Sequence, residues 1–151
     1  MRAVPSLRAP HPALVLLVDD NSHGIVARRN VLEELGYHVI SAASGADALK
    51  LMEEHNFELV ITDYRMPAMD GVALIAELRH RGFKSPVILL SGLLAHLGLT
   101  EKTSGADLLI QKSANEMEHL VRGVKRLLDA PKKPAGTQGM TPRKRRRTVD
   151  A

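Results

Sequence analysis

ITDYRMPAMDG (residues 61–71) continues an apolar run and places two aspartates, a proline and a glycine directly after it. A short, almost continuously apolar run is typical of a parallel strand that is covered on both faces of its sheet. Pro67 and the Asp70-Gly71 pair are turn residues. The stretch therefore predicts a buried strand over residues 58–62 whose carboxyl end presents the Asp63 carboxylate.

Four more short apolar runs and five helical patterns alternate along the chain. The runs cover residues 13–18, 37–41, 86–91 and 107–111. The helical patterns are 21–35 before Gly36, a helix opened by a Ser44/Asp47 capping box, a helix through Val72, Ile75 and Leu78, a segment at about 93–103 that Gly98 interrupts, and a last helix from a Ser113/Glu116 capping box to Pro131. Five successive strand–helix units predict an α/β fold with a five-stranded parallel sheet, doubly wound, with helices on both faces.

Composition predicts one domain with two unstructured ends. The chain has 151 residues, 44% of them apolar and 25% charged, which is ordinary for a globular protein. The proline-rich residues 1–12 and the Pro- and Gly-containing residues 131–151 lack apolar periodicity, so we expect a domain over 13–130 between disordered ends. The last segment carries a net charge of +6, whereas 13–130 carries −4.

The same composition excludes several classes of protein. Without cysteine the chain has no disulfide, thiolate metal site or thiol nucleophile. The apolar run at 13–18 is too short for a membrane span or a signal peptide. We therefore expect a cytoplasmic protein with no membrane span.

Polar residues stand at the carboxyl ends of four predicted strands: Asp19 and Asp20, Asp63, Ser91, and Lys112. Taken singly, each also fits a structural role, such as a helix cap, a turn or a solvated charge. In a doubly wound sheet these strand ends are neighbours, and ligands bind at this edge. Three close carboxylates without histidine or cysteine favour a hard cation, and Mg²⁺ in particular. Asp63 beside Mg²⁺, a hydroxyl and an ammonium group is suited to accept a phosphoryl group.

The motifs LLVDDN, ITDYRMPAMDG, LLSG and GADLLIQK resemble the receiver domain of two-component response regulators, over about residues 13–130. The resemblance implies a flavodoxin-like receiver fold in which Asp63 takes a phosphoryl group from a histidine kinase or a phosphotransfer protein. It implies that Asp19, Asp20, Asp63 and the backbone carbonyl of Arg65 hold Mg²⁺, that Ser91 bonds a phosphoryl oxygen and that Lys112 pairs with the phosphate. It also implies slow self-dephosphorylation, influenced by the positions of Arg65 and Leu93.

Two residues depart from the family's pattern. Leu109 stands where receivers usually have an aromatic residue that rotates on activation, so we expect it to pack in the core and signal readout to be altered. Ser113 follows Lys112 where proline is common, which disfavours a cis peptide bond there.

Three functional classes follow from these observations. The leading one is a single-domain response regulator that signals by altered docking, since residues 131–151 are too few to build an output domain. The alternative is a receiver-like interaction module that no longer switches. An aspartate-nucleophile phosphatase is disfavoured because Arg65 occupies the place of its acid-base aspartate, and neither a P-loop nor an HExxH motif is present.

The sequence says less about partners. The basic run at 142–147 favours weak, unspecific binding to nucleic acid or another anionic surface, without an aromatic residue to stack on bases. A solvated tail that aids solubility is the competing interpretation. The sequence does not distinguish a monomer from a homodimer.

Overall fold

The computed structural model describes residues 12–129, apart from the side chains of residues 95 and 96. The predicted disordered ends therefore lie outside the described residues, except for residue 12. Five strands and six helices occur in the described part, in the order β1 Leu14–Val18, α1 Ser22–Glu34, β2 His38–Ala42, α2 Gly45–Glu54, β3 Leu59–Asp63, α3 Gly71–His80, β4 Val87–Ser91, α4 Leu94–Leu97, α5 Glu101–Ser104, β5 Leu108–Gln111 and α6 Glu116–Asp129.

All five strands form one parallel sheet in the order β2-β1-β3-β4-β5. This confirms the predicted doubly wound α/β fold. Because the order reverses between β1 and β3, the connections leave opposite faces of the sheet there and open a crevice at the carboxyl edge. The residues that follow β1 and β3 lie at this switch point.

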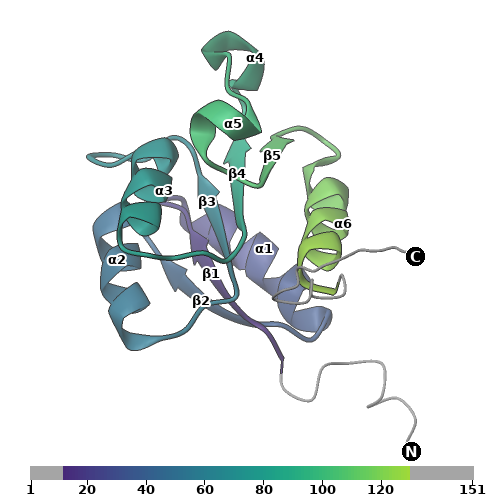
Figure 1. The fold of residues 1–151 in the computed structure, drawn as a ribbon. Helices are drawn as coiled ribbons and strands as arrows, with labels where there is room; N and C mark the ends of the chain where they lie inside the picture. Colours follow the sequence, from purple (N-terminus) through teal and green to yellow (C-terminus); the bar gives the residue numbers. More distant parts are fainter. Residues whose placement is uncertain (1–11, 130–151) are drawn as a thin grey trace, which may run out of the picture.

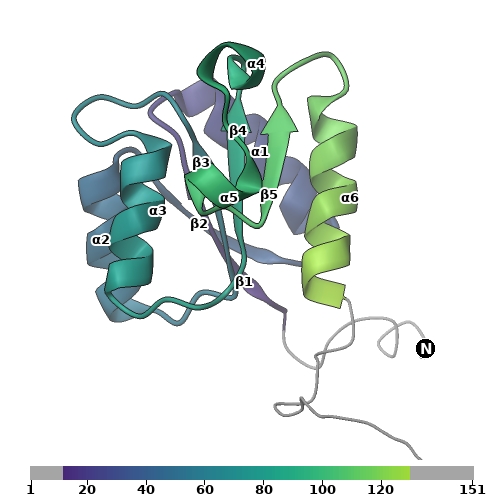
Figure 2. The same ribbon diagram turned by 45° about the horizontal axis from the view of Figure 1, so that its top comes forward.

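Helices cover both faces of the sheet, with α2 and α3 on one side and α1 and α6 on the other (Figures 1 and 2). Strand alternation explains the two layers, since successive side chains of a strand point to opposite faces. In β1, Leu16 and Val18 pack in the core beneath α2 and α3, and Val15 and Leu17 pack beneath α1 and α6. The four side chains are at most 1% exposed, so this strand is buried on both faces.

The helix ends follow the predicted capping residues in α1 and α2. Gly36 has φ +100° directly after the C-cap of α1, a conformation that favours glycine. The Ser44 hydroxyl accepts a hydrogen bond from the backbone N–H of Asp47 at the start of α2. Residues close in sequence determine both ends, which is why the sequence predicts them.

The segment after β4 differs from the expected fourth helix over about 93–103. It contains two helices of four residues each, α4 and α5, separated at Gly98, which has φ +63°. Thr100 then caps α5 through a reciprocal capping box with Thr103. Because Gly98 takes a left-handed conformation and Thr100 caps a new helix, one continuous helix cannot form here.

The predicted Ser113/Glu116 capping box is wrong. The Ser113 hydroxyl accepts from the backbone N–H of Asn115, and α6 begins only at Glu116. The Glu116 carboxylate accepts a hydrogen bond from Arg28 in α1 instead. A long-range ion pair has thus taken the carboxylate that a local cap would have used.

Within residues 12–129, no helix is long and apolar enough to cross a lipid bilayer. The peptide bonds of the same residues are all trans, which agrees with the serine at position 113.

Candidate functional site

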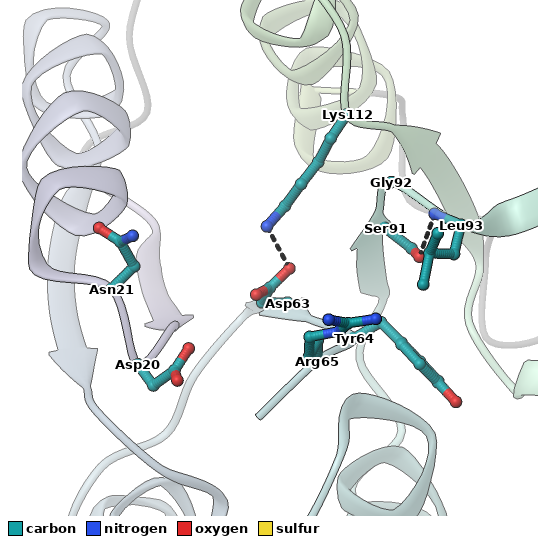
Figure 3. Close-up of a pocket in the computed structure, with 9 residues that line it drawn as sticks. All are labelled: Asp20, Asn21, Asp63, Tyr64, Arg65, Ser91, Gly92, Leu93 and Lys112. Atoms are coloured by element: carbon teal, nitrogen blue, oxygen red, sulfur yellow. Dashed lines mark hydrogen bonds and ion pairs between the residues drawn. The ribbon is translucent and has the colours of Figure 1, made fainter. Parts of the chain in front are cut away.

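A pocket of about 380 Å³ lies at the carboxyl edge of the sheet. Figure 3 shows the residues that line it, which come from the ends of β1, β3, β4 and β5: Asp20, Asn21, Asp63, Tyr64, Arg65, Ser91, Gly92, Leu93 and Lys112. The structure therefore brings the predicted residues of four strand ends into one cavity. Arg65 lines the pocket with its neighbours Asp63 and Tyr64, whereas Asp19 is not among the lining residues.

The three aspartates form one cluster. Asp19, Asp20 and Asp63 each have a carboxylate oxygen within 4.8 Å of the other two. Asp19 and Asp63 are 1% and 5% exposed, whereas Asp20 is exposed to solvent. Asn21, rather than either aspartate of the Asp19-Asp20 pair, caps α1. The purely structural interpretation of that pair as a helix cap is therefore wrong.

Lys112 and Ser91 approach the cluster from β5 and β4. The Lys112 ammonium group lies 2.5 Å from a carboxylate oxygen of Asp63 (Figure 3). Ser91 is 2% exposed, and its hydroxyl accepts a hydrogen bond from the backbone N–H of Leu93 at 3.0 Å. Both groups thus face the pocket from the side opposite Asp19 and Asp20.

The environment makes ionisation of Asp63 unfavourable. Burial raises the pKa of its carboxyl group above the usual range, because a charge is poorly solvated there. The Lys112 and Arg28 charges oppose this increase in pKa, and the Asp19 charge adds to it. Additional positive charge in the pocket would favour the ionised form of Asp63.

Arg28 is a member of the site that the sequence argument missed. Its side chain is buried in α1, where its guanidinium donates to Asp19 Oδ2 at 2.5 Å and to Glu116 Oε2 at 2.7 Å. Burial alone would lower the pKa of Arg28, but the bonds to Glu116 and Asp19 outweigh it and raise the pKa. The available signal was position, since Arg28 lies one turn before Leu32 on the face of α1 that packs against the sheet.

Arg28 also changes the argument for a metal ion. Three close carboxylates repel one another unless cations offset their charge. In the structure Arg28 pairs with Asp19 and Lys112 pairs with Asp63, so protein cations already reduce that repulsion. The donor set still suits Mg²⁺, because oxygens of three carboxylate groups lie within 4.8 Å of one another and hard oxygen ligands are those that Mg²⁺ prefers.

The loop after Asp63 holds the carboxylate by close backbone packing. A Cβ atom on Gly71 would lie 2.5 Å from the backbone oxygen of Asp63 and 2.6 Å from Leu89 Cδ1, so no larger residue fits. The Gly71 backbone N–H also donates to the Tyr64 carbonyl. Ala68 in the same loop has φ +68°, which is strained for a residue with a Cβ. The turn predicted from Pro67 and Asp70-Gly71 thus fixes the end of β3.

Residues 15–125 match the family described as the response regulator receiver domain. The chain belongs to this family. Receiver domains are signalling modules of two-component systems rather than classical enzymes. The family assignment confirms the resemblance and the flavodoxin-like receiver fold, and it leaves the roles of the individual pocket residues as predictions.

Curated relatives support the same family. The response regulator GtcR of Aneurinibacillus migulanus is 35% identical over 114 residues, which are 72% of this chain and 45% of GtcR. The transcriptional regulatory protein GlrR of Escherichia coli is 40% identical over 80 residues, which are 53% of this chain and 18% of GlrR. The chain therefore spans less than half the length of these relatives.

Solved structures agree with the fold. The response regulator TrrA of Thermotoga maritima, in complex with Mg²⁺-BeF, superposes with a TM-score of 0.69 at 31% identity, over 77% of this chain and 99% of TrrA. The chemotaxis response regulator CheY4 of Vibrio cholerae gives a TM-score of 0.71 at 28% identity, over 78% of this chain and 99% of CheY4.

Leu109 of this receiver packs against the core on the α2 and α3 side of the sheet, as predicted, and is half-buried. It lies in β5, three residues before Lys112. A leucine at this place supplies core contacts and no ring that could rotate.

Proposed function

We propose that this receiver accepts a phosphoryl group onto Asp63 from a histidine kinase or a phosphotransfer protein, in a Mg²⁺-dependent reaction, and signals by altered docking. The observation that supports the proposal is the position of the buried Asp63 carboxylate in an open pocket, with two aspartates on one side and Ser91 and Lys112 on the other. Carboxylates with this environment act as covalent phosphoryl acceptors.

The reaction would transfer the phosphoryl group from a donor nitrogen to a carboxylate oxygen of Asp63. The N–P bond breaks and an O–P bond forms, while the electron pair of the broken bond stays on the imidazole, which takes up a proton. Lys112 now binds Asp63 itself. During transfer its ammonium group would move to a phosphoryl oxygen and offset the charge that develops there.

Mg²⁺ would be held by Asp19, Asp20, Asp63 and the backbone carbonyl of Arg65. Asp63 would then be both a metal ligand and the phosphoryl acceptor. The ion supplies positive charge that offsets the negative oxygens of the transferring phosphoryl group. The Ser91 hydroxyl would donate a hydrogen bond to a phosphoryl oxygen. It can do so while its oxygen still accepts the hydrogen bond from the Leu93 backbone N–H. That bond links phosphorylation to the segment that begins α4.

Signal readout would then use this segment without an aromatic switch. When Ser91 moves to bond the phosphoryl group, Leu93 and the short helices α4 and α5 shift with it, while Leu109 stays in the core. Beryllofluoride, a phosphoryl mimic, tests this step by nuclear magnetic resonance. We expect amide shifts that extend from the pocket into residues 93–104, and shifts confined to the surroundings of Asp63 would contradict this readout.

The decisive test of the proposal is phosphorylation itself. Acetyl phosphate with Mg²⁺ should retard the wild-type protein in phosphate-affinity electrophoresis, and omission of Mg²⁺ or the Asp63→Asn substitution should remove the retarded band. Asp70→Asn is the matched control, because Asp70 caps α3 in the same loop and should leave the band intact. A retarded band in Asp63→Asn would show that another residue is the acceptor.

The second candidate function is an interaction module with the receiver fold that no longer switches, and Leu109 in place of the usual aromatic favours it. A wild-type protein that takes no label from acetyl phosphate or a kinase would support this function. The single-domain organisation, the cytoplasmic location, slow self-dephosphorylation, a homodimer and weak binding of anionic partners through 142–147 remain parts of the proposal, and 142–147 lies outside the described residues.

A further inference from the structure

A buried ion network connects the acidic cluster to α6. Arg28 is 6% exposed and bridges Asp19 Oδ2 and Glu116 Oε2 through two different nitrogens. The Glu116 side chain is 14% exposed and lies at the first residue of α6. One guanidinium in the middle of α1 therefore links the residue after β1 to the first residue of α6.

The surrounding backbone is built around this network. A Cβ atom on Gly24 would lie 2.6 Å from Asp19 Oδ2 and 2.8 Å from the Arg28 nitrogen that binds it. A side chain at position 24 would thus push the ion pair apart. Asp19 Oδ1 is also occupied, since it accepts from the backbone N–H of Asn21 at 2.9 Å. Both carboxylate oxygens of Asp19 already have protein donors.

The positive charge of Arg28 lies next to the place that a divalent ion would occupy. Asp19 has an oxygen within 4.8 Å of the oxygens of Asp20 and Asp63. The same carboxylate forms an ion pair with Arg28. Two cations on one buried carboxylate repel each other, and the repulsion is strong where water is excluded. Arg28 should therefore weaken the binding of any divalent ion to this cluster.

We propose that Arg28 is a positioning residue that holds Asp19 as an internal counter-ion and competes with Mg²⁺ for that carboxylate, so that Arg28 sets the metal affinity of the pocket. Glu116 modulates the competition, because it is the second carboxylate that holds the guanidinium. Occupation of the metal site is thereby felt at the start of α6. The inference rests on the metal binding in the proposed function.

Calorimetric titration with MgCl₂ tests the competition directly. We expect Arg28→Gln to bind Mg²⁺ about tenfold more tightly than the wild type, since a repelling charge is removed. Arg29→Gln is the matched control. It makes the same charge change one residue further along α1, but Arg29 pairs with Ser41 and Glu33 rather than with Asp19.

Glu116→Gln should change the Mg²⁺ affinity in the opposite direction, and it leaves both members of the Arg28–Asp19 pair in place. Without Glu116 the guanidinium has Asp19 as its remaining ion-pair partner, so we expect about threefold weaker Mg²⁺ binding. Glu118→Gln is its control, because Glu118 is exposed and pairs with Arg122. In the Arg28→Gln background, Glu116→Gln should have no further effect.

Equal affinities of Arg28→Gln and Arg29→Gln would overturn the inference, as would an effect of Glu116→Gln that persists without Arg28. Should Arg28→Gln not fold, the comparison of Glu116→Gln with Glu118→Gln decides, and equal affinities there overturn it. The proposed function is tested by a separate experiment, the Mg²⁺-dependent labelling of wild-type Asp63. If neither the wild type nor any variant binds Mg²⁺, the metal step of the proposed function and this inference both fail.

Discussion

The two sides of the pocket are built differently. On the β1 and β3 side, Asp19 and Asp63 are almost completely buried, and α1, with 13 residues, holds Arg28 against Asp19. On the β4 and β5 side, α4 and α5 have four residues each, and the Lys112 side chain is 33% exposed. The fixed side is suited to hold charges at constant distances, and the loosely built side is suited to move when Ser91 gains a partner.

The largest expected effect concerns local opening. Short helices make few buried contacts and open easily, so the amides of α4 and α5 should exchange with deuterium about 1000-fold faster than those in the middle of β1 and β3. Hydrogen exchange followed by nuclear magnetic resonance measures both sets in one sample. Similar exchange rates in the two sets would remove the contrast between the two sides.

Glycine-to-alanine substitutions compare the packing of the two sides. Gly71→Ala places a Cβ 2.5 Å from the Asp63 backbone oxygen, and we expect it to lower the free energy of unfolding by about 3 kcal/mol. Gly98→Ala meets no atom within 4 Å and pays only for its φ of +63°, about 1 kcal/mol. Urea denaturation measures both values. A larger loss of unfolding free energy for Gly98→Ala would contradict the assignment of the β1 and β3 side as the fixed side.

Asp63 itself should destabilise the metal-free protein. Its pKa is raised by burial, so the unfolded chain ionises first as pH rises, and the folded state loses stability relative to it above about pH 4. Asp63→Asn removes this loss and should raise the free energy of unfolding by about 1 kcal/mol at pH 7. The gain should shrink as the pH falls toward 4, where the folded and the unfolded wild type both become protonated.

Asp70→Asn is the control for that comparison, since asparagine and aspartate cap a helix about equally well. Its stability should stay within about 0.5 kcal/mol of the wild type at either pH. Urea denaturation at the two pH values provides both measurements. A gain for Asp63→Asn that is independent of pH would mean that packing, and not ionisation, is responsible.

The smallest expected effect is at Ala68, in the loop between β3 and α3. Ala68→Gly relieves the left-handed conformation at φ +68° but adds freedom to the unfolded chain, so we expect a net gain of only about 0.5 kcal/mol. Thermal unfolding should show a small rise in Tm. A fall in Tm would mean that the added freedom of the unfolded chain, together with any lost contacts of the alanine methyl group, outweighs the relief of backbone strain.

Local patterns in the sequence determined the architecture. Continuous apolar runs specify strands covered on both faces, and Gly36 and Ser44 mark helix ends through interactions of a few residues' span. Once the strands are parallel, their carboxyl ends share an edge, so the sequence alone predicts that Asp19, Asp20, Asp63, Ser91 and Lys112 lie near one another.

Tertiary structure alone decided how the buried charges of Asp19, Arg28 and Glu116 pair. Glu116 has the spacing of a local cap, yet it binds Arg28, 88 residues away in sequence. Arg28 in turn neutralises Asp19, and no local pattern contains that information. The physical reason is that a buried charge takes the partner that the packed helices bring within reach, and its desolvation outweighs the small gain from a helix cap.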